Sequence, residues 1–165
     1  MLNLEPEQIA KYFHRSFKAV DGLWFMKVEE IYGFETALDI DEAVWKIMPK
    51  IQARLLLSFS GMGKGLAALQ ECLDTKLHIE GYEAESNLEE KGGTLTIRIS
   101  RCPWLDIITE AGRGHLADIV GTRICSVEYQ IWAGEFGDTI SFELASQLCH
   151  AGGHACVLRF HDSRA

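Results

Sequence analysis

The sequence predicts an α+β protein in which N-terminal helices precede a four-stranded antiparallel sheet with helices packed on it. Apolar residues recur at helical spacing through the first half, whereas the second half contains segments in which apolar and polar residues alternate, as in half-buried strands. Strands and helices do not alternate as in a βαβ protein. With 165 residues, 47% of them hydrophobic, we expect a single domain over 1–165, with a helical half at 5–76 and an α+β half at 77–162.

A long helix is expected at the N-terminus, because its apolar residues are spaced by three or four positions throughout. Pro6 suits a first helical turn, and Gly33 is a natural stop. The apolar stripe is rich in aromatic residues, which suits either a core or a seam between two helices, and we expect a homodimer formed through the N-terminal helices. The stripe consists of Ile9, Phe13, Phe17, Val20, Trp24, Val28 and Ile31.

Four more helices are expected along the chain. The first covers 41–57, where Pro49 removes a backbone donor and should kink the helix or split it in two. The others cover 66–76, 104–110 and 114–136, and the last is the longest.

Four strands are expected in the second half, at 77–85, 94–101, 139–149 and 154–161. We expect the first two to be joined around 89–93 and the last two to form a hairpin. The second strand has the clearest alternation, with Leu95, Ile97 and Ile99 between Thr94, Thr96, Arg98 and Ser100.

The charge of the chain excludes two classes of partner. Its formal net charge is −8, and no cluster of Lys or Arg compensates it locally. A nucleic-acid partner and an anionic membrane surface both require clustered basic charge. No apolar run approaches the ~20 residues of a membrane-spanning helix. The N-terminus, MLNLEPEQIAKYF, is acidic where a secretory signal would be basic and then apolar, so we expect a cytoplasmic protein.

The cysteines are the main candidates for chemistry. There are five, and in a reducing compartment they indicate metal binding, catalysis or plain burial more often than disulfides. Two of them flank a Gly-Gly pair in the segment LCHAGGHACVLRF at 148–160. If Gly152 and Gly153 form a two-residue turn, Cys149 faces Cys156 with Cβ atoms ~4.5–5.5 Å apart, close enough to share a zinc ion. The residues alone leave zinc binding and inert buried thiols both open.

The histidines and one glycine-rich loop are weaker candidates. His150 and His154 flank the Gly-Gly turn and, by strand alternation, point away from the thiols. The spacing of the histidines neither shows nor excludes a catalytic triad, so the catalytic residues stay unidentified. The segment GMGKG at 61–65 imitates a phosphate-binding loop, but Ser58 stands where its first glycine belongs and Gly65 replaces the hydroxyl residue after lysine. We interpret it as an interhelical loop.

Two family resemblances add to this interpretation. The span 102–160 resembles the C-terminal half of 4-vinyl reductase-type domains, which carry a helix cysteine, a strand ending in cysteine, a glycine-containing turn and another cysteine. The whole chain, including YFHRSFKAVDGLWFMKVEEIYGFETALDIDEAVW at 12–45, resembles uncharacterised bacterial and archaeal proteins grouped near the aminothiazoline-carboxylate hydrolase family. The resemblance implies an α+β ligand-binding fold shared with phenol-sensing regulators and, more distantly, with haem-nitric-oxide sensors and Golgi tethering subunits.

The resemblance also implies a metal site. In the phenol-sensing branch, three cysteines and a glutamate bind zinc beside a pocket for an aromatic ligand. Cys125, Cys149 and Cys156 match the three thiols, but Ser146 stands where that glutamate is expected. The candidates for the fourth ligand are Cys102, Glu128, His150 and His154. We favour Cys102, because a thiolate suits zinc and its segment could pack against the hairpin.

These observations together predict a cytoplasmic zinc-binding domain that holds a small organic ligand, with aromatic compounds as one class, in a sensing or accessory role. The zinc would be structural, because three or four thiolates leave no open coordination position. One alternative is a hydrolase of a cyclic C–N bond, such as that of L-2-amino-thiazoline-4-carboxylic acid. Another is an assembly module like the tethering subunits.

Overall fold

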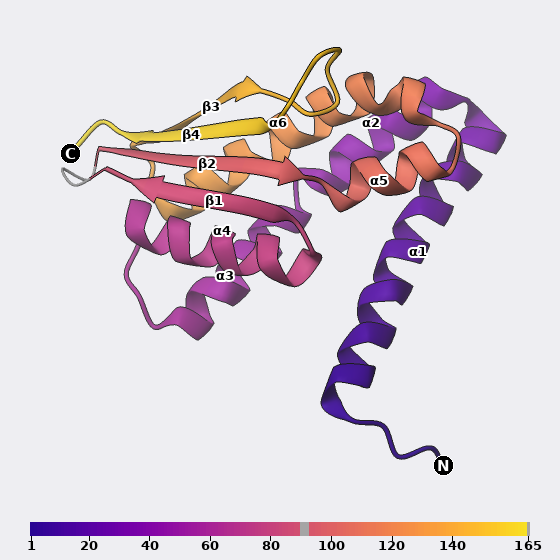
Figure 1. Cartoon of the computed structure of the whole chain (residues 1–165), viewed down its shortest axis with the longest axis horizontal. Helices are drawn as coiled ribbons and strands as arrows, with labels where there is room; N and C mark the ends of the chain where they lie inside the picture. Colours follow the sequence, from indigo (N-terminus) through magenta and orange to yellow (C-terminus); the bar gives the residue numbers. More distant parts are fainter. Residues whose placement is uncertain (90–92, 165) are drawn as a thin grey trace. The chain divides into compact units, whose positions relative to one another are not determined.

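The computed structural model describes residues 1–89 and 93–164, shown as a ribbon in Figure 1. The chain forms two compact units, Met1–Ala43 and Val44–Ala165, which we call the N-terminal and the C-terminal unit. This boundary differs from the one predicted from the sequence, which separated a helical half at 5–76 from an α+β half at 77–162. The helices after residue 44 belong with the sheet, and each unit is described by itself.

The N-terminal unit consists of two helices, α1 (Pro6–Tyr32) and α2 (Phe34–Trp45), the second of which ends just beyond the boundary. The bounds of α1 confirm the long helix predicted from the apolar stripe. It begins with a reciprocal cap in which the backbone N–H of Glu5 donates to Oε1 of Gln8 at 2.9 Å. It ends at Gly33, whose φ of 87° is accessible to glycine at little cost.

The C-terminal unit opens with two helices, α3 (Met48–Ser60) and α4 (Leu66–Glu80). Pro49 lies in the first turn of α3, and the helix predicted over 41–57 is split in two near this proline, which was one of the two expected outcomes. The two helices, α2 and α3, are separated by a turn. The prediction that a strand begins at residue 77 was wrong, because Leu77 continues the buried face of α4 and β1 begins only at Glu83. The helix stops at Gly81, which has a φ of 86°.

The sheet consists of β1 (Glu83–Leu88), β2 (Thr94–Arg101), β3 (Ile140–Ser146) and β4 (Cys156–Asp162). Its strand order is β1-β2-β4-β3, and each neighbouring pair is antiparallel (Figure 1). The α+β class, with N-terminal helices followed by a four-stranded antiparallel sheet, is therefore confirmed. The predicted turn around 89–93 lies mostly outside the described residues.

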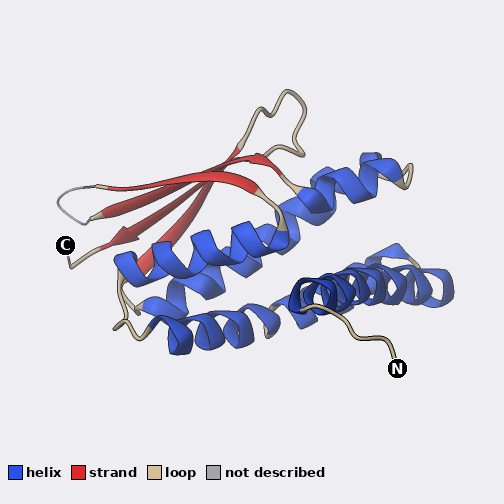
Figure 2. Ribbon diagram, turned by 60° about the horizontal axis from the view of Figure 1, so that its bottom comes forward, coloured by secondary structure: helices blue, strands red, loops and turns tan. Residues whose placement is uncertain are grey.

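Between β2 and β3 the chain forms the short helix α5 (Pro103–Glu110), a 3₁₀ turn (Gly114–Leu116) and the long helix α6 (Ala117–Phe136). Helices α4 and α6 pack on one face of the sheet, and α3 packs against both of them (Figure 2). Within the described residues, no helix has both the length and the apolar character to cross a membrane. The largest fully buried side chains of the core include Leu69, Leu73, Leu77, Leu95, Ile97, Trp132, Phe136, Leu158 and Phe160.

Candidate metal centre

Four of the five cysteines come from separate segments of the C-terminal unit. Cys102 immediately precedes α5, and Cys125 lies in the middle of α6. Cys149 lies in the loop between β3 and β4, and Cys156 is the first residue of β4. All four are half-buried and free, whereas Cys72, a residue of α4, is buried in the core. The four half-buried cysteines, which we call the thiol cluster, are the four that the sequence analysis named as metal ligands.

The members of the thiol cluster lie close enough together to affect one another's ionisation. Burial raises the pKa of Cys125 well above its usual value, and the charges of Glu128 and of the other three thiols raise it further. Burial, followed by the charge of Cys156, raises the pKa of Cys149 to about 11. No member of the cluster contributes to the pKa of Cys72, which burial raises. Negative charge on one thiol therefore opposes negative charge on the others, and a cation placed among them would relieve this repulsion.

Cys149 packs directly against α6. A β-carbon placed on Gly121 would lie only 2.9 Å from its Sγ atom, and 3.7 Å from the ring of Trp104. Gly121 and Cys125 are one helical turn apart and therefore share a face of α6. The missing side chain at Gly121 allows the thiol of the loop to approach the helix next to Cys125.

The predicted pairing of Cys149 with Cys156 across a two-residue turn was wrong. The ladder between β3 and β4 ends with Ser146 opposite Val157, after an irregularity in the register. Residues 147–155 therefore form a long loop, and Cys149 is not in the sheet. The two thiols are neighbours because this loop folds over α6, which strand alternation could not predict.

Two glycines shape this loop, although not as a primed hairpin turn. Gly152 has a φ of 76°, and the N–H of Gly153 donates to the carbonyl oxygen of His150 at 2.9 Å. A β-carbon on Gly153 would lie 2.0 Å from the carbonyl oxygen of Gln147, closer than any real contact. Gly153 is therefore required for the loop to close on itself, whereas Gly152 is required only for its backbone angle.

Polar contacts hold the loop against the start of α6. The hydroxyl of Thr122 donates to the side-chain oxygen of the buried Gln147 at 3.0 Å. Nε2 of His150 lies 3.0 Å from the carboxylate of Asp118 and 3.1 Å from the hydroxyl of Thr122. Because both contacts use the same ring nitrogen, His150 does not bridge two groups as the histidine of a catalytic triad does. His154 is exposed.

Backbone N–H groups lie near two of the thiols. The N–H of Leu148 donates to Sγ of Cys156 at 3.3 Å. Burial raises the pKa of Cys102, and the N–H groups of Trp104 and Leu105, at the start of α5, oppose that increase. Both arrangements favour a thiolate, which is the form that binds a metal.

The thiol cluster is not already arranged around a common centre. Among the residues that the structure describes, no three or more Cys, His, Asp and Glu side chains are positioned to hold a metal ion. A tetrahedral zinc site with Zn–S distances of about 2.3 Å needs sulfur atoms roughly 3.8 Å apart. The four side chains would have to turn toward one another to form such a site.

A buried ion pair next to the thiol cluster was missed by the sequence analysis. Nζ of Lys76, a residue only 3% exposed, lies 2.8 Å from Oε1 of Glu128 and 2.7 Å from Oε2 of Glu80. Burial by itself would lower the pKa of Lys76, but the two carboxylates outweigh it and raise the pKa above its usual value. Burial also raises the pKa of Glu128, and the positive charge of Lys76 opposes this increase. Glu128 lies one turn beyond Cys125 on α6, so this charged pair borders the thiols.

One signal in the sequence could have identified this pair. Lys76 stands beside Leu73 and Leu77 on the apolar face of α4, and Glu128 stands between Ile124 and Trp132 on that of α6. A basic residue in one apolar stripe and an acidic residue in another suggest a buried ion pair, because either charge alone would be costly to bury.

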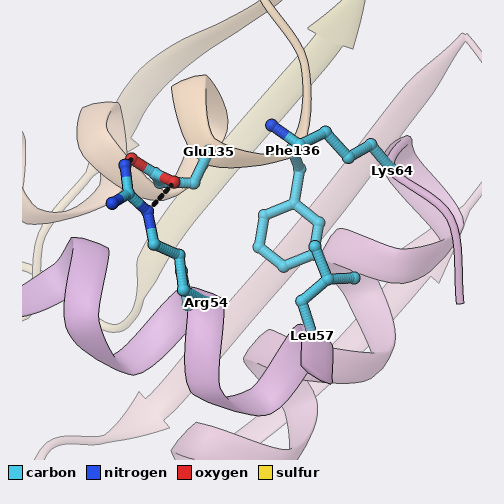
Figure 3. A pocket seen from close by; sticks show the side chains of 6 residues that line it. Arg54, Leu57, Lys64, Glu135 and Phe136 are labelled. Carbon is cyan, nitrogen blue, oxygen red and sulfur yellow. Dashed lines mark hydrogen bonds and ion pairs between the residues drawn. The ribbon is translucent and has the colours of Figure 1, made fainter. Parts of the chain in front are cut away.

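A pocket of about 320 Å³ lies elsewhere in the C-terminal unit, between α3, the loop that follows it and the C-terminal end of α6. On one side, the guanidinium of Arg54 makes a two-pronged contact with the carboxylate of Glu135, at 2.7 and 2.9 Å. Lys64 reaches in from the loop on the other side, and Phe136 and Leu57 lie between them (Figure 3). Two cationic groups and one carboxylate leave this pocket with an excess positive charge.

The fold and the site define an α+β domain with a half-buried cluster of thiols beside a buried ion pair. The chain belongs to DUF6125, a family of unknown function, and the match covers residues 5–160. No curated protein matches the chain. The resemblances to 4-vinyl reductase-type domains and to the aminothiazoline-carboxylate hydrolase family therefore stay predictions.

Proposed function

We propose that the protein is a cytoplasmic zinc-binding domain in which Cys102, Cys125, Cys149 and Cys156 hold a structural zinc ion, and that it binds a small organic molecule. The observation that carries the metal site is geometric: Cys149 lies against α6 one turn from Cys125, and the N–H of its neighbour Leu148 donates to Sγ of Cys156. The charge of Cys102 raises the pKa of all three of these thiols. Four thiolates would fill a tetrahedral zinc site and leave no position for a substrate.

The electrostatics of the cluster favour a cation. In the metal-free protein, burial and mutual repulsion keep the thiols protonated at neutral pH. Zinc offers each thiolate a positive partner and displaces its proton, so metal binding removes the repulsion. A bound ion would also tie the start of α5 and the loop between β3 and β4 to the middle of α6.

The surroundings support Cys102 as the fourth ligand over the other three candidates. Glu128 is already paired with the buried ammonium of Lys76. His150 is engaged by the polar residues at the start of α6, and His154 is exposed. Cys102, by contrast, raises the pKa of Cys125 and of Cys156 through its charge.

Metal analysis of the purified protein tests the site. We expect stoichiometric zinc in the wild-type protein and loss of zinc in Cys149→Ser. Cys72→Ala is the matched control, because Cys72 is buried outside the cluster, and it should keep its zinc. A wild-type protein that is folded, stable and free of metal would contradict the proposal.

No observation favours the hydrolase over a binding role. A cysteine nucleophile needs a lowered pKa, and burial raises the pKa of every thiol in the cluster. We therefore expect no ring opening when the protein is assayed with an aminothiazoline carboxylate. Turnover that is abolished in Cys149→Ser would favour the enzyme instead.

The pocket between α3 and α6 supports a ligand of definite chemistry. Leu57, which is half-buried, offers apolar surface, and Arg54 is neutralised by Glu135, which leaves Lys64 as the cation in excess. We expect a small organic acid whose apolar body lies on Leu57. The pocket is separate from the zinc site, because Glu135 lies ten residues after Cys125 on α6, about 15 Å along the helix axis.

Binding of simple probes tests this ligand class. Benzoate should bind in an NMR titration more tightly than benzyl alcohol, which has the same ring but no charge. In Lys64→Gln, we expect benzoate to bind about tenfold more weakly, because a charge-assisted contact is lost. Lys11→Gln, on α1, changes the net charge equally and should leave benzoate binding unaltered. Equal affinity for the two probes would contradict an acid-binding pocket.

We also propose that the protein is a homodimer and that the N-terminal helices form the interface. The support is the exposed apolar face of α1, which carries large aromatic side chains. Sedimentation equilibrium of the full-length protein measures this directly. We expect a mass of two chains, and a monomer at micromolar concentrations would contradict the dimer.

A further inference from the structure

The apolar stripe of α1 is mostly uncovered within its own unit. Phe13 is 65% exposed and Trp24 is 68% exposed, whereas Val28 is buried. Solitary exposed apolar residues are normal on a protein, but a row of them along one helix marks an interaction surface. The exposed members of the stripe are Ile9, Phe13, Phe17, Val20, Trp24 and Ile31.

The spacing of the stripe keeps it nearly straight along the helix. Its intervals of four, four and three residues repeat every 11 positions, so that Ile9, Val20 and Ile31 lie on one line. From Ile9 to Ile31, which are 22 positions apart, this line extends about 33 Å. Two such helices could therefore stay in contact along most of their length with little supercoiling.

The charges of α1 are divided between its two halves. From Pro6 to Lys18 there are three basic residues and one acidic residue, which gives +2 with histidine neutral. From Val20 to Tyr32 there are three acidic residues and one basic residue, which gives −2. Two parallel copies would place like charges side by side, whereas two antiparallel copies place the basic half of each beside the acidic half of the other.

We propose that the occupant of this face is a second copy of the chain, with the two α1 helices packed antiparallel about an axis next to Val20. This arrangement rests on the proposed homodimer and specifies its geometry. Val20, midway along the stripe, meets its own counterpart, and Ile9 meets Ile31 of the second copy. Phe17 packs against Trp24 of the second copy, near the centre of the interface where aromatic contacts contribute most to affinity.

Cysteine cross-linking distinguishes the two orientations. Val20→Cys should form a covalent dimer under mild oxidation, because the new thiol meets itself at the axis. Ile9→Cys alone should stay uncross-linked, but its mixture with Ile31→Cys should yield a mixed covalent dimer. The wild-type chain controls for the five native cysteines. Arg15→Cys, on the opposite side of α1, controls for random collision. Self-cross-linking of Ile9→Cys as efficient as that of Val20→Cys would overturn the antiparallel arrangement.

A substitution in the stripe separates this interface from the metal site. Trp24→Asp should raise the Kd of the dimer by about 100-fold, because an aromatic anchor is replaced by a charge. Its zinc content should equal that of the wild-type protein, since the thiol cluster lies in the C-terminal unit. If the wild-type chain is monomeric, another part of the same chain or a different protein covers the face, and the proposal is overturned.

Discussion

The two long helices, α1 and α6, bury their apolar residues to very different extents. Nine residues of α6 are buried, against only Val28 on α1. One face of α6, including the carboxylate of Glu128, is buried under the sheet. The thiol cluster lies at the border of this core. Apolar periodicity therefore establishes a helix but does not specify which other element packs against its apolar face. For α6 the sheet covers it, and for α1 we propose a second chain.

The largest effect is expected at the buried ion pair, which is the feature that α6 has and α1 lacks. Lys76→Met leaves the carboxylate of Glu128 buried without its cation, and we expect the free energy of unfolding to fall by about 3–5 kcal/mol. Denaturant unfolding of the zinc-loaded protein measures this loss.

The pH dependence of the same variant provides its control. Burial already raises the pKa of Glu128, and the loss of Lys76 raises it further, so protonation of this carboxyl should restore part of the lost stability. The deficit of Lys76→Met should shrink as the pH falls through that pKa. The double variant Lys76→Met/Glu128→Leu should be more stable than Lys76→Met. A deficit that stays constant with pH would indicate lost packing instead of an unpaired charge.

A smaller effect is expected in the loop that carries Cys149. Gly153→Ala places a β-carbon onto the carbonyl oxygen of Gln147, so the loop must open, and we expect a loss of about 2–3 kcal/mol together with weaker zinc binding. Gly152→Ala is the matched control. The φ of 76° at this position is strained for alanine, but nothing lies within 4 Å of the new β-carbon. It should cost only about 1 kcal/mol. Equal zinc affinity in the two variants would show that the loop does not position Cys149 for the metal.

The smallest perturbation is a change of pH alone. Zinc must displace protons from the thiols, since their pKa values are raised and that of Cys149 reaches about 11. The apparent zinc affinity should therefore increase between pH 6 and pH 8 by about tenfold per pH unit for each proton released. Competition with a chelator at several pH values measures this slope. The C72A variant should follow the same slope, and an affinity independent of pH would argue against thiol ligands.

The sequence predicted those parts of the fold that depend on local periodicity. The stripe of α1 and the alternation of β2 specified one helix and one strand, and Pro49 marked a break between helices. The boundary of α4 was missed because Leu77 suits a buried helix and a buried strand equally well. The division of the chain into two units was also not predicted, because no linker composition marks it.

The candidate site could be predicted only in part, because its geometry depends on contacts between distant segments. The resemblance named three cysteines, and Cys102 was added because a thiolate suits zinc. The charges of these thiols affect one another's pKa values, but their side chains are not arranged around a common centre in the described residues. The pairing of Cys149 with Cys156 was derived from a turn that the chain does not form. A Gly-Gly doublet is compatible both with a tight hairpin and with a loop that folds back on itself. The partnership of Lys76 with Glu128 joins two helices 52 positions apart in sequence, and no local pattern links them.

X-ray absorption at the zinc edge of the purified protein identifies the atoms that bind the metal. We expect a tetrahedral shell of four sulfur atoms at about 2.3 Å, unchanged in Cys72→Ala and reduced to three sulfurs or lost in Cys102→Ser. A folded wild-type protein that contains no zinc, or zinc with a shell of nitrogen and oxygen only, would contradict the proposed zinc site.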